Sequence, residues 1–296
     1  MHSFLIASSI SCPAEVDIGF VQLGWFKVVI LGIVQGITEL LPISSTAHLR
    51  IVPALLGWQD PGSAFSAAMQ LASLAAVITY FWKDIQHLVG GMVRAVAERD
   101  FQSRRFKLPL GLLVGTVPIA VAGLLLKKTL NACHSPFRSL VVIGIASIVM
   151  SLLLALAEKR GGRDRGFAQL SLEDGIWVGI AQAFALIPGV SRSGSTLTAG
   201  LFLGMHRETS AKFSFLLGLP AVVLAGALEL HTLLKAGLSL EGWGTLLIGL
   251  ISASISAFLA IYGLLHYLER QSTWIFVWYR LAMGVFLLSA SLGRLL

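Results

Sequence analysis

Residues 32–48 read GIVQGITELLPISSTAH and residues 179–196 read GIAQAFALIPGVSRSGST, so two similar stretches lie about 147 positions apart. Each begins as an apolar helical sequence, is interrupted at a proline and continues with serine and with charged or titratable side chains. Polar groups at membrane depth usually mark a functional site. The duplication predicts that the two copies meet at such a site.

The composition around these stretches is that of an integral membrane protein. Of 296 residues, 56% are hydrophobic and 12% are charged, and the mean hydropathy is +0.82, which is too apolar for a soluble globule. A helix needs roughly 20 apolar residues to cross the hydrocarbon layer. We therefore expect an all-α polytopic membrane protein with about six transmembrane helices, over residues 62–82, 108–126, 139–157, 211–230, 243–266 and 274–293.

The basic residues lie between the apolar runs. A formal net charge of +7 would suit nucleic-acid binding in a soluble protein. Here the arginines and lysines gather in the connections 83–107 and 158–174, which the positive-inside rule places in the cytoplasm. Orientation in the bilayer explains this charge, so no nucleic-acid partner is expected, and both chain termini are predicted to be external.

One membrane domain, residues 1–296, is predicted to hold an inverted repeat. Aligning residues 35–85 with 182–233 pairs Gln35 with Gln182. Each half would consist of a hairpin and three spans, over residues 22–160 and 175–294. Three is an odd number, so the second copy is expected to have the opposite orientation.

Both hairpins are predicted to be re-entrant. After each proline the remaining helical segment, 47–57 or 195–204, is too short to cross the membrane. Interrupted backbone at membrane depth is tolerated only inside protein or beside a watery cavity. With the basic connections inside, the hairpin at 22–57 enters from outside and the hairpin at 175–204 enters from inside.

The second stretch has the features of a phosphate-binding site. Small residues after Pro188-Gly189 expose backbone N–H groups at a helix N-terminus, which favours anions. Arg192 adds a forked cation, and neighbouring hydroxyls add donors. Close helix packing alone would explain the small residues but not an arginine at membrane depth.

The first stretch has the features of a metal or acid–base site. Gln35 and Glu39 are four residues apart and share one helix face, so they could hold Mg²⁺ or Ca²⁺ together with phosphate oxygens. Alternatively, Glu39 accepts a proton, or it is structural and pairs with the interrupted backbone or with Arg192. Ser45 and His48 are three apart and could form a nucleophile–base pair, or His48 could itself attack phosphorus. A structural reading of His48 as a buried donor also remains open.

Arg280 is a weaker candidate, about seven residues into the last apolar run. It could contact the site or pair with Glu229, and its extension to the membrane interface is equally compatible with the sequence.

These motifs resemble the undecaprenyl-diphosphate phosphatase family, also called bacitracin-resistance proteins. Gln35 to Glu39 is similar to the family's (E/Q)xxxE motif, Pro42 to His48 to its PxSSTxH motif, and Pro188 to Thr196 to its PGxSRSxxT motif. The resemblance covers essentially the whole chain from about residue 22. It implies an enzyme of the bacterial cytoplasmic (inner) membrane that hydrolyses a C55 polyprenyl diphosphate to the monophosphate and phosphate, with a site open to the periplasmic or external side.

The resemblance also implies roles for individual residues. Glu39 and Gln35 would be the metal-binding or acid–base pair, with Mg²⁺ or Ca²⁺ as the cofactor, although Gln35 replaces the glutamate of other members. Ser45 or His48 would be the nucleophile, beside the catalytic Arg192. The expected phosphate-binding residues are Ser44, Ser191, Arg192, Ser193 and Thr196.

A transporter of lipid phosphates or anions is the main alternative, because inverted repeats with interrupted helices are common among transporters. The same arginine would then bind cargo and no bond would break. The expected partners are the polyprenyl diphosphate and membrane lipid, and the sequence leaves a homodimer open.

Overall fold

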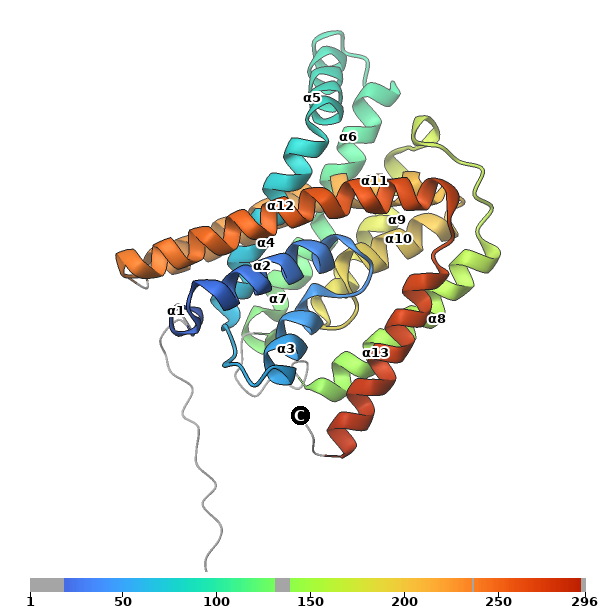
Figure 1. The fold of residues 1–296 in the computed structure, drawn as a ribbon. Coiled ribbons are helices and arrows are strands. Elements are labelled where there is room, and N and C mark those ends of the chain that lie inside the picture. Colours follow the sequence, from blue (N-terminus) through green and yellow to red (C-terminus); the bar gives the residue numbers. More distant parts are fainter. Residues whose placement is uncertain (1–18, 131–138, 236, 294–296) are drawn as a thin grey trace, which may run out of the picture.

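The computed structural model describes residues 19–130, 139–235 and 237–293, in which the regular structure is helical apart from a single β-bridge between Arg165 and Met205 (Figure 1). The elements are α1 (Phe20–Leu23), α2 (Trp25–Leu40), α3 (Ser45–Leu55), α4 (Ser63–Tyr80), α5 (Trp82–Ala97), α6 (Arg104–Val114), α7 (Val117–Leu130), α8 (Leu140–Arg160), η2 (Phe167–Gln169), α9 (Leu172–Ala183), η3 (Phe184–Leu186), α10 (Arg192–Phe202), α11 (Arg207–Lys235), α12 (Leu240–Arg270) and α13 (Trp274–Leu292).

The described residues contain five helical stretches that are long and apolar enough to cross a membrane: Arg104–Leu126, Leu140–Arg160, Arg207–Leu228, Leu240–Arg270 and Trp274–Leu292. A sixth apolar stretch, Ala68–Tyr80 within α4, is shorter. Helices suit these sequences because a helix satisfies its own backbone hydrogen bonds where no water is available. The predicted all-α polytopic protein is confirmed. The described residues contain five full-length candidate spans, where about six were expected. The termini predicted to be external, residues 1–18 and 294–296, lie outside the described ranges.

The basic connection 83–107 is largely helical. Most of it is helix α5, which with the start of α6 projects from the body (Figure 1). Trp82, Val89, Val93 and Val96 are exposed on α5, and their spacing gives this helix an apolar side. This helix was not predicted from the sequence, because its basic residues make it too polar for a membrane span.

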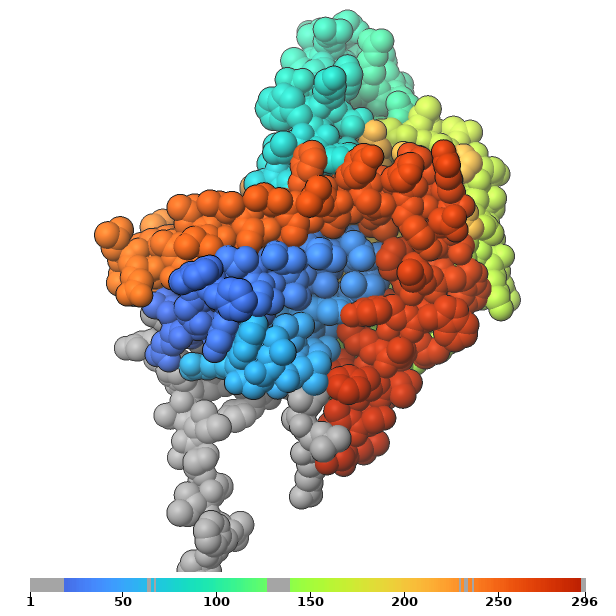
Figure 2. Space-filling view, viewed as in Figure 1, coloured from blue at the N-terminus to red at the C-terminus, as the bar shows by residue number. Residues whose placement is uncertain are grey.

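Two interrupted segments pack closely against long helices. A Cβ atom at Gly36 of α2 would collide with the carbonyl oxygen of Ala253 in α12, and one at Gly175 of α9 would collide with that of Gly111 in α6. Small residues let membrane helices approach to backbone contact. In Figure 2 one face of the molecule shows α2 and α3 (blue) bordered by α12 (orange) and α13 (red).

The largest buried apolar cluster lies beside α10. Leu197 and Leu201 of this helix are buried with Phe213 and Leu217 of α11. Burying such side chains fixes α10 against α11. The short helix that follows the second proline is therefore held by packing along its length.

Ion pairs join the ends of the helices at the predicted cytoplasmic side. The buried Glu158 of α8 pairs with Arg207 of α11 and accepts a hydrogen bond of 2.8 Å from the hydroxyl of Thr273. Arg165 donates to both carboxylate oxygens of Asp174 at 2.8 and 2.9 Å. This hydrogen bonding raises the pKa of Arg165 against the effect of desolvation. The basic connection 158–174 is thus tied to the helices that carry the second stretch.

Candidate active site

Two breaks in the helical backbone carry the candidate residues. The first break, residues 41–44, separates α2 from α3, and the second break, residues 187–191, separates η3 from α10. Ser44 ends the first break with φ 72° and Ser191 ends the second with φ 71°. Left-handed backbone is uncommon for serine and costs of order 1–3 kcal/mol. The two serines occupy the same position in the duplicated stretches, so the local backbone is duplicated as well.

The end of α2 and the first break contact the start of α10 directly. The hydroxyl of Ser193, in the first turn of α10, lies 3.2 Å from the backbone oxygen of Glu39 and 3.0 Å from that of Leu41. These carbonyls are at the end of α2, where a helix leaves backbone acceptors without partners. The expectation that the duplicated stretches meet is confirmed by these hydrogen bonds.

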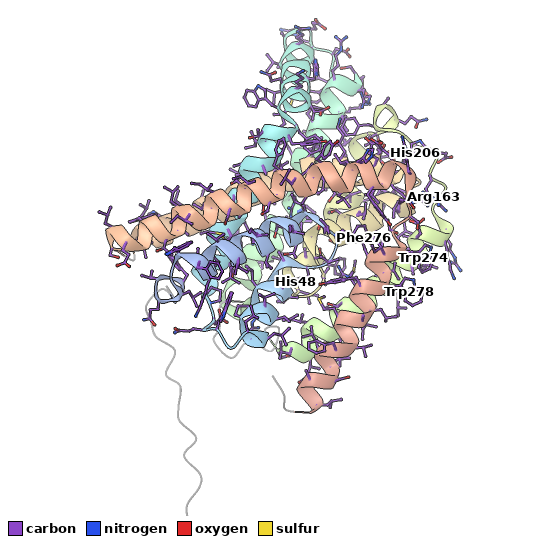
Figure 3. All side chains as sticks on the ribbon, viewed as in Figure 1. His48, Arg163, His206, Trp274, Phe276 and Trp278 are labelled. Atoms are coloured by element: carbon purple, nitrogen blue, oxygen red, sulfur yellow. The ribbon has the colours of Figure 1, made fainter. Side chains whose placement is uncertain are left out.

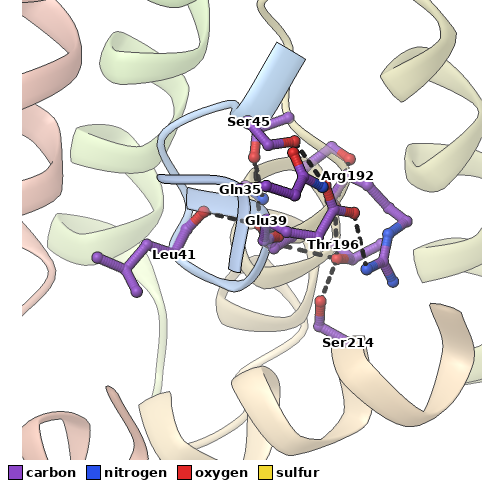
Figure 4. A network of polar contacts seen from close by, with 11 residues as sticks. Gln35, Glu39, Leu41, Ser45, Arg192, Thr196 and Ser214 are labelled. Atoms are coloured by element: carbon purple, nitrogen blue, oxygen red, sulfur yellow. Dashed lines mark hydrogen bonds and ion pairs between the residues drawn. The ribbon is translucent and has the colours of Figure 1, made fainter. Parts of the chain in front are cut away.

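The Glu39 carboxylate is the centre of a polar network (Figure 4). Its Oε2 accepts hydrogen bonds from Gln35 Nε2 at 3.0 Å and from the Ser45 hydroxyl at 2.5 Å, while Oε1 lies 3.4 Å from Arg192 Nη2. Glu39 is 8% exposed and the Arg192 side chain 13%. A nearly buried carboxylate therefore has one cationic partner and two hydrogen-bond donors, as a buried charge requires.

Both ring nitrogens of His48 have partners other than Ser45. Its Nδ1 lies 2.7 Å from the carbonyl oxygen of Ser44, and its Nε2 lies 2.5 Å from the hydroxyl of Tyr279. Because a carbonyl can only accept, Nδ1 carries the hydrogen, and in a neutral ring Nε2 accepts from Tyr279. Figure 3 shows His48 on α3, on the side facing α13.

The predicted pairing of Ser45 with His48 is not formed. The helix does resume at Ser45, which puts the two residues on one face, but the Ser45 hydroxyl points back across the break to Glu39. Side chains of a helix lean towards its N-terminus, which directs Ser45 to the end of α2. The hydrogen-bond partner of Ser45 is therefore Glu39, and not His48 as the sequence spacing had suggested.

Polar groups surround the N-terminus of α10. Ser191 caps the helix by accepting from Gly194 N at 3.2 Å, and its hydroxyl lies 3.2 Å from that of Ser193. The N–H groups of Arg192 and Ser193 have no acceptor within the helix. They lie at its partially positive end.

Thr196 lies deeper than the other candidates. Its hydroxyl donates to Arg192 O at 2.7 Å, makes a close contact with the hydroxyl of Ser214 in α11, and is fully buried. In this conformation Thr196 fixes α10 to its neighbour, and Ser214 is a residue of the site that sequence analysis did not identify.

Arg280 occupies the space between the two breaks. It is 1% exposed, and its guanidinium donates to the carbonyl oxygens of Pro42, Gly189 and Val190 at 2.8 to 2.9 Å. Extension to the membrane interface, one of the readings open from sequence, is excluded. The Glu229 side chain, the other suggested partner, lies outside the described residues.

Known proteins resemble this chain over most of its length. The sequence profile of the family described as bacitracin resistance protein BacA matches residues 28–286. The chain is 61% identical over 254 residues to undecaprenyl-diphosphatase 2 of Mesorhizobium japonicum, covering 86% of this chain and 96% of the relative. It is 54% identical to an undecaprenyl-diphosphatase of Gloeobacter violaceus, over 93% of this chain and 94% of the relative.

A third relative, an undecaprenyl-diphosphatase of Trichormus variabilis, is 52% identical over 94% of this chain and 87% of its own length. The matched region contains both breaks and Arg280. The resemblance carried by the three motifs is confirmed, and the chain belongs to the family of bacitracin resistance protein BacA.

Proposed function

We propose that this protein is an integral membrane phosphatase that hydrolyses undecaprenyl diphosphate to undecaprenyl phosphate and inorganic phosphate, which recycles the lipid carrier for cell-wall synthesis and confers bacitracin resistance. Membership of the BacA family and the activity named for its relatives support this proposal. The observation that carries it is the convergence of Ser45, Glu39 and Arg192 where two interrupted helices meet.

The diphosphate head group carries several negative charges, and its hydrolysis requires their neutralisation. Arg192 and the free N–H groups at the start of α10 are suited to bind the terminal phosphate, with Ser44, Ser191 and Ser193 close by. In a site largely closed to water these donors have stronger effects than they would have in solution. Binding of the phosphate would draw the Arg192 guanidinium from Glu39, with which it pairs at 3.4 Å.

The hydrogen bond between Ser45 and Glu39 favours Ser45 over His48 as the nucleophile. Glu39 would accept the hydroxyl proton while Ser45 Oγ forms a bond to the terminal phosphorus and the bond from phosphorus to the bridging oxygen breaks, releasing undecaprenyl phosphate. Glu39 would pass this proton to the departing undecaprenyl phosphate. Water would then attack the phosphoserine and give a proton to Glu39, which would return it to Ser45 Oγ as the bond from phosphorus to the serine oxygen breaks and phosphate is released. His48, with both ring nitrogens hydrogen-bonded, would hold the start of α3 beside the reacting phosphate.

The residues around Glu39 fit a divalent cation that binds chiefly through the substrate. Among the described residues, no group of three or more histidine, cysteine, aspartate or glutamate side chains could form a metal site. Glu39 and Gln35 offer a carboxylate and an amide oxygen, which are hard donors of the kind that Mg²⁺ and Ca²⁺ prefer. When bound, such an ion would neutralise phosphate charge during the transfer.

The architecture that we propose is the inverted repeat of residues 22–160 and 175–294, with re-entrant hairpins formed by α2–α3 and α9–α10. Matching packing supports it: α2 lies against α12, the second long helix of the other half, and α9 lies against α6. The pairs α8–α13 and α4–α11 each join equivalent helices. The matching positive φ angles of Ser44 and Ser191 have the same explanation.

The apolar tail of the substrate requires a path within the bilayer. A groove of about 740 Å³ runs between α2 and α12 and reaches the start of α13. Leu41, which lines the groove, also belongs to the first break, and Ile275 at its other side is one helical turn from Tyr279. We assign the isoprenoid chain to this groove. The protein would lie in the bacterial cytoplasmic membrane. The diphosphate head group would enter the site from the external side.

The test of the enzyme is release of phosphate from undecaprenyl diphosphate by the purified protein with Mg²⁺ or Ca²⁺. We expect multiple turnovers with the wild type. Binding of the lipid without release of phosphate would refute hydrolysis and favour the transporter.

A further inference from the structure

The guanidinium of Arg280 bridges the two breaks in a way that no other described side chain does. Nη1 donates to the carbonyl oxygen of Pro42 in the first break at 2.8 Å. Nη2 donates to Gly189 and Val190 in the second break at 2.8 and 2.9 Å. These residues are far apart in sequence, so one planar group sets the distance between two loops.

Arg280 is buried at a considerable cost. A cation without an ionic partner is expensive inside a protein and more so at membrane depth, and no carboxylate of the described residues forms an ion pair with Arg280. Its compensation comes from carbonyl oxygens at interrupted helix ends, which carry partial negative charge. Stability alone would be served as well by an apolar side chain and a rearranged loop, so the arrangement calls for a role beyond stability.

Gly194 leaves the space that this guanidinium needs. A Cβ atom at position 194 would lie 2.8 Å from Arg280 Nη1, which is closer than a carbon and a nitrogen can pack. Arg280 therefore contacts the first turn of α10 as well as both breaks. The close approach of Arg280 therefore explains the glycine in the sequence Ser191-Arg192-Ser193-Gly194.

We infer that Arg280 is a positioning residue of the phosphatase reaction, which sets the register of the two breaks. Pro42 is two residues before Ser44, and Val190 directly precedes Ser191. The guanidinium therefore binds the backbone just before each of the two serines with positive φ. Through them it fixes Ser45 and Glu39 on one side against Arg192 on the other. This inference rests on the proposed function, since it concerns the alignment of nucleophile and phosphate.

The first test uses Arg280→Lys and Arg280→Met. Lysine keeps the charge but cannot reach three carbonyl groups with one planar fork. We expect Arg280→Lys to lower kcat about 100-fold, the effect of a misplacement of roughly 1 Å, with KM and the melting temperature little changed. Arg270→Lys makes the same chemical change at an exposed position and should leave kcat unchanged. Wild-type kcat in Arg280→Met, or loss of stability without loss of kcat in Arg280→Lys, would overturn the inference.

Gly194→Ala is a second variant, and it keeps Arg280 in the protein. The added methyl group should displace the guanidinium and lower kcat by a similar factor. Because both changes act on one contact, the double variant with Arg280→Lys should be no slower than the slower single variant. Effects on kcat that multiply would mean that the two residues act independently.

A spectroscopic readout separates this inference from the proposed function. Spin labels at Thr46 of α3 and Phe202 of α10, both exposed, would be attached in a background with Cys12→Ser and Cys133→Ser. Arg280→Met should broaden the distance distribution between the labels, and Arg270→Lys should not. An unchanged distribution refutes the positioning role, whereas a wild type that releases no phosphate refutes the proposed function and leaves the distance result to stand on its own.

Discussion

The hydroxyl of Ser45 lies 2.5 Å from Glu39 Oε2, across a break that separates the two residues by six positions. The carboxylate is at the end of one helix and the hydroxyl at the start of the next. The break therefore gives a serine an adjacent base, which a continuous helix would not allow because residues six apart lie on different turns. A nucleophile and its base are expected to be within this distance.

Removing either partner should abolish most of the activity. We expect Ser45→Ala and Glu39→Gln each to lower kcat by about 10³-fold, within the range of general base contributions. Phosphate release by the purified variants measures the effect. Ser254→Ala, whose hydroxyl bonds to Ala72 O far from the breaks, is the matched control.

The identity of the nucleophile can be read directly from the protein. During turnover, rapid acid quenching and mass spectrometry should find phosphate on Ser45. Phosphate on His48, or a Ser45→Ala variant with wild-type kcat, would show that the serine is not the nucleophile.

His48 of α3 and Tyr279 of α13 form a hydrogen bond and stack their rings. Tyr279→Phe removes one hydrogen bond, worth about 1 kcal/mol net, so kcat should fall roughly 5-fold, whereas His48→Ala also removes the contact with Ser44 O and should lose most of the activity. Steady-state kinetics of the two variants test the order of these effects. Equal losses would mean that the tyrosine does more than hold the ring.

A bound cation should be detectable through Gln35. Removing divalent ions with a chelator should stop phosphate release, and Mg²⁺ or Ca²⁺ should restore it. Gln35→Glu adds a second carboxylate beside Glu39 and should lower the ion concentration needed for half-maximal activity. Gln182→Glu places the same change in the equivalent position of the other stretch, where Leu186 takes the place of Glu39, and should leave the ion requirement unchanged. An ion requirement that Gln35→Glu does not alter would argue against Gln35 as a ligand.

The sequence predicted the helical spans and the meeting of the two stretches, because apolar length and proline breaks are local signals. The contact of Glu39 with Arg192 was one of the alternatives that the sequence left open. The partner of Ser45 was not predicted, because helix spacing relates Ser45 to His48 but carries no information on how α2 ends. Arg280 and Tyr279 were equally hard to place, since their roles depend on where α13 lies relative to both breaks. A buried arginine in an apolar span was the one signal available for them.

Chain-length dependence tests the groove between α2 and α12. Ile37 lines this groove and is 40% exposed, so Ile37→Trp should fill part of it. Because only a long isoprenoid chain would occupy the groove, the variant should raise KM for undecaprenyl diphosphate several-fold and leave KM for the C15 compound farnesyl diphosphate unchanged. Ile145→Trp makes the same change on α8, at a residue 50% exposed and outside the groove, and should affect neither substrate. If Ile37→Trp changed KM equally for both chain lengths, the tail would have to lie elsewhere, and the groove would be a surface filled by membrane lipid.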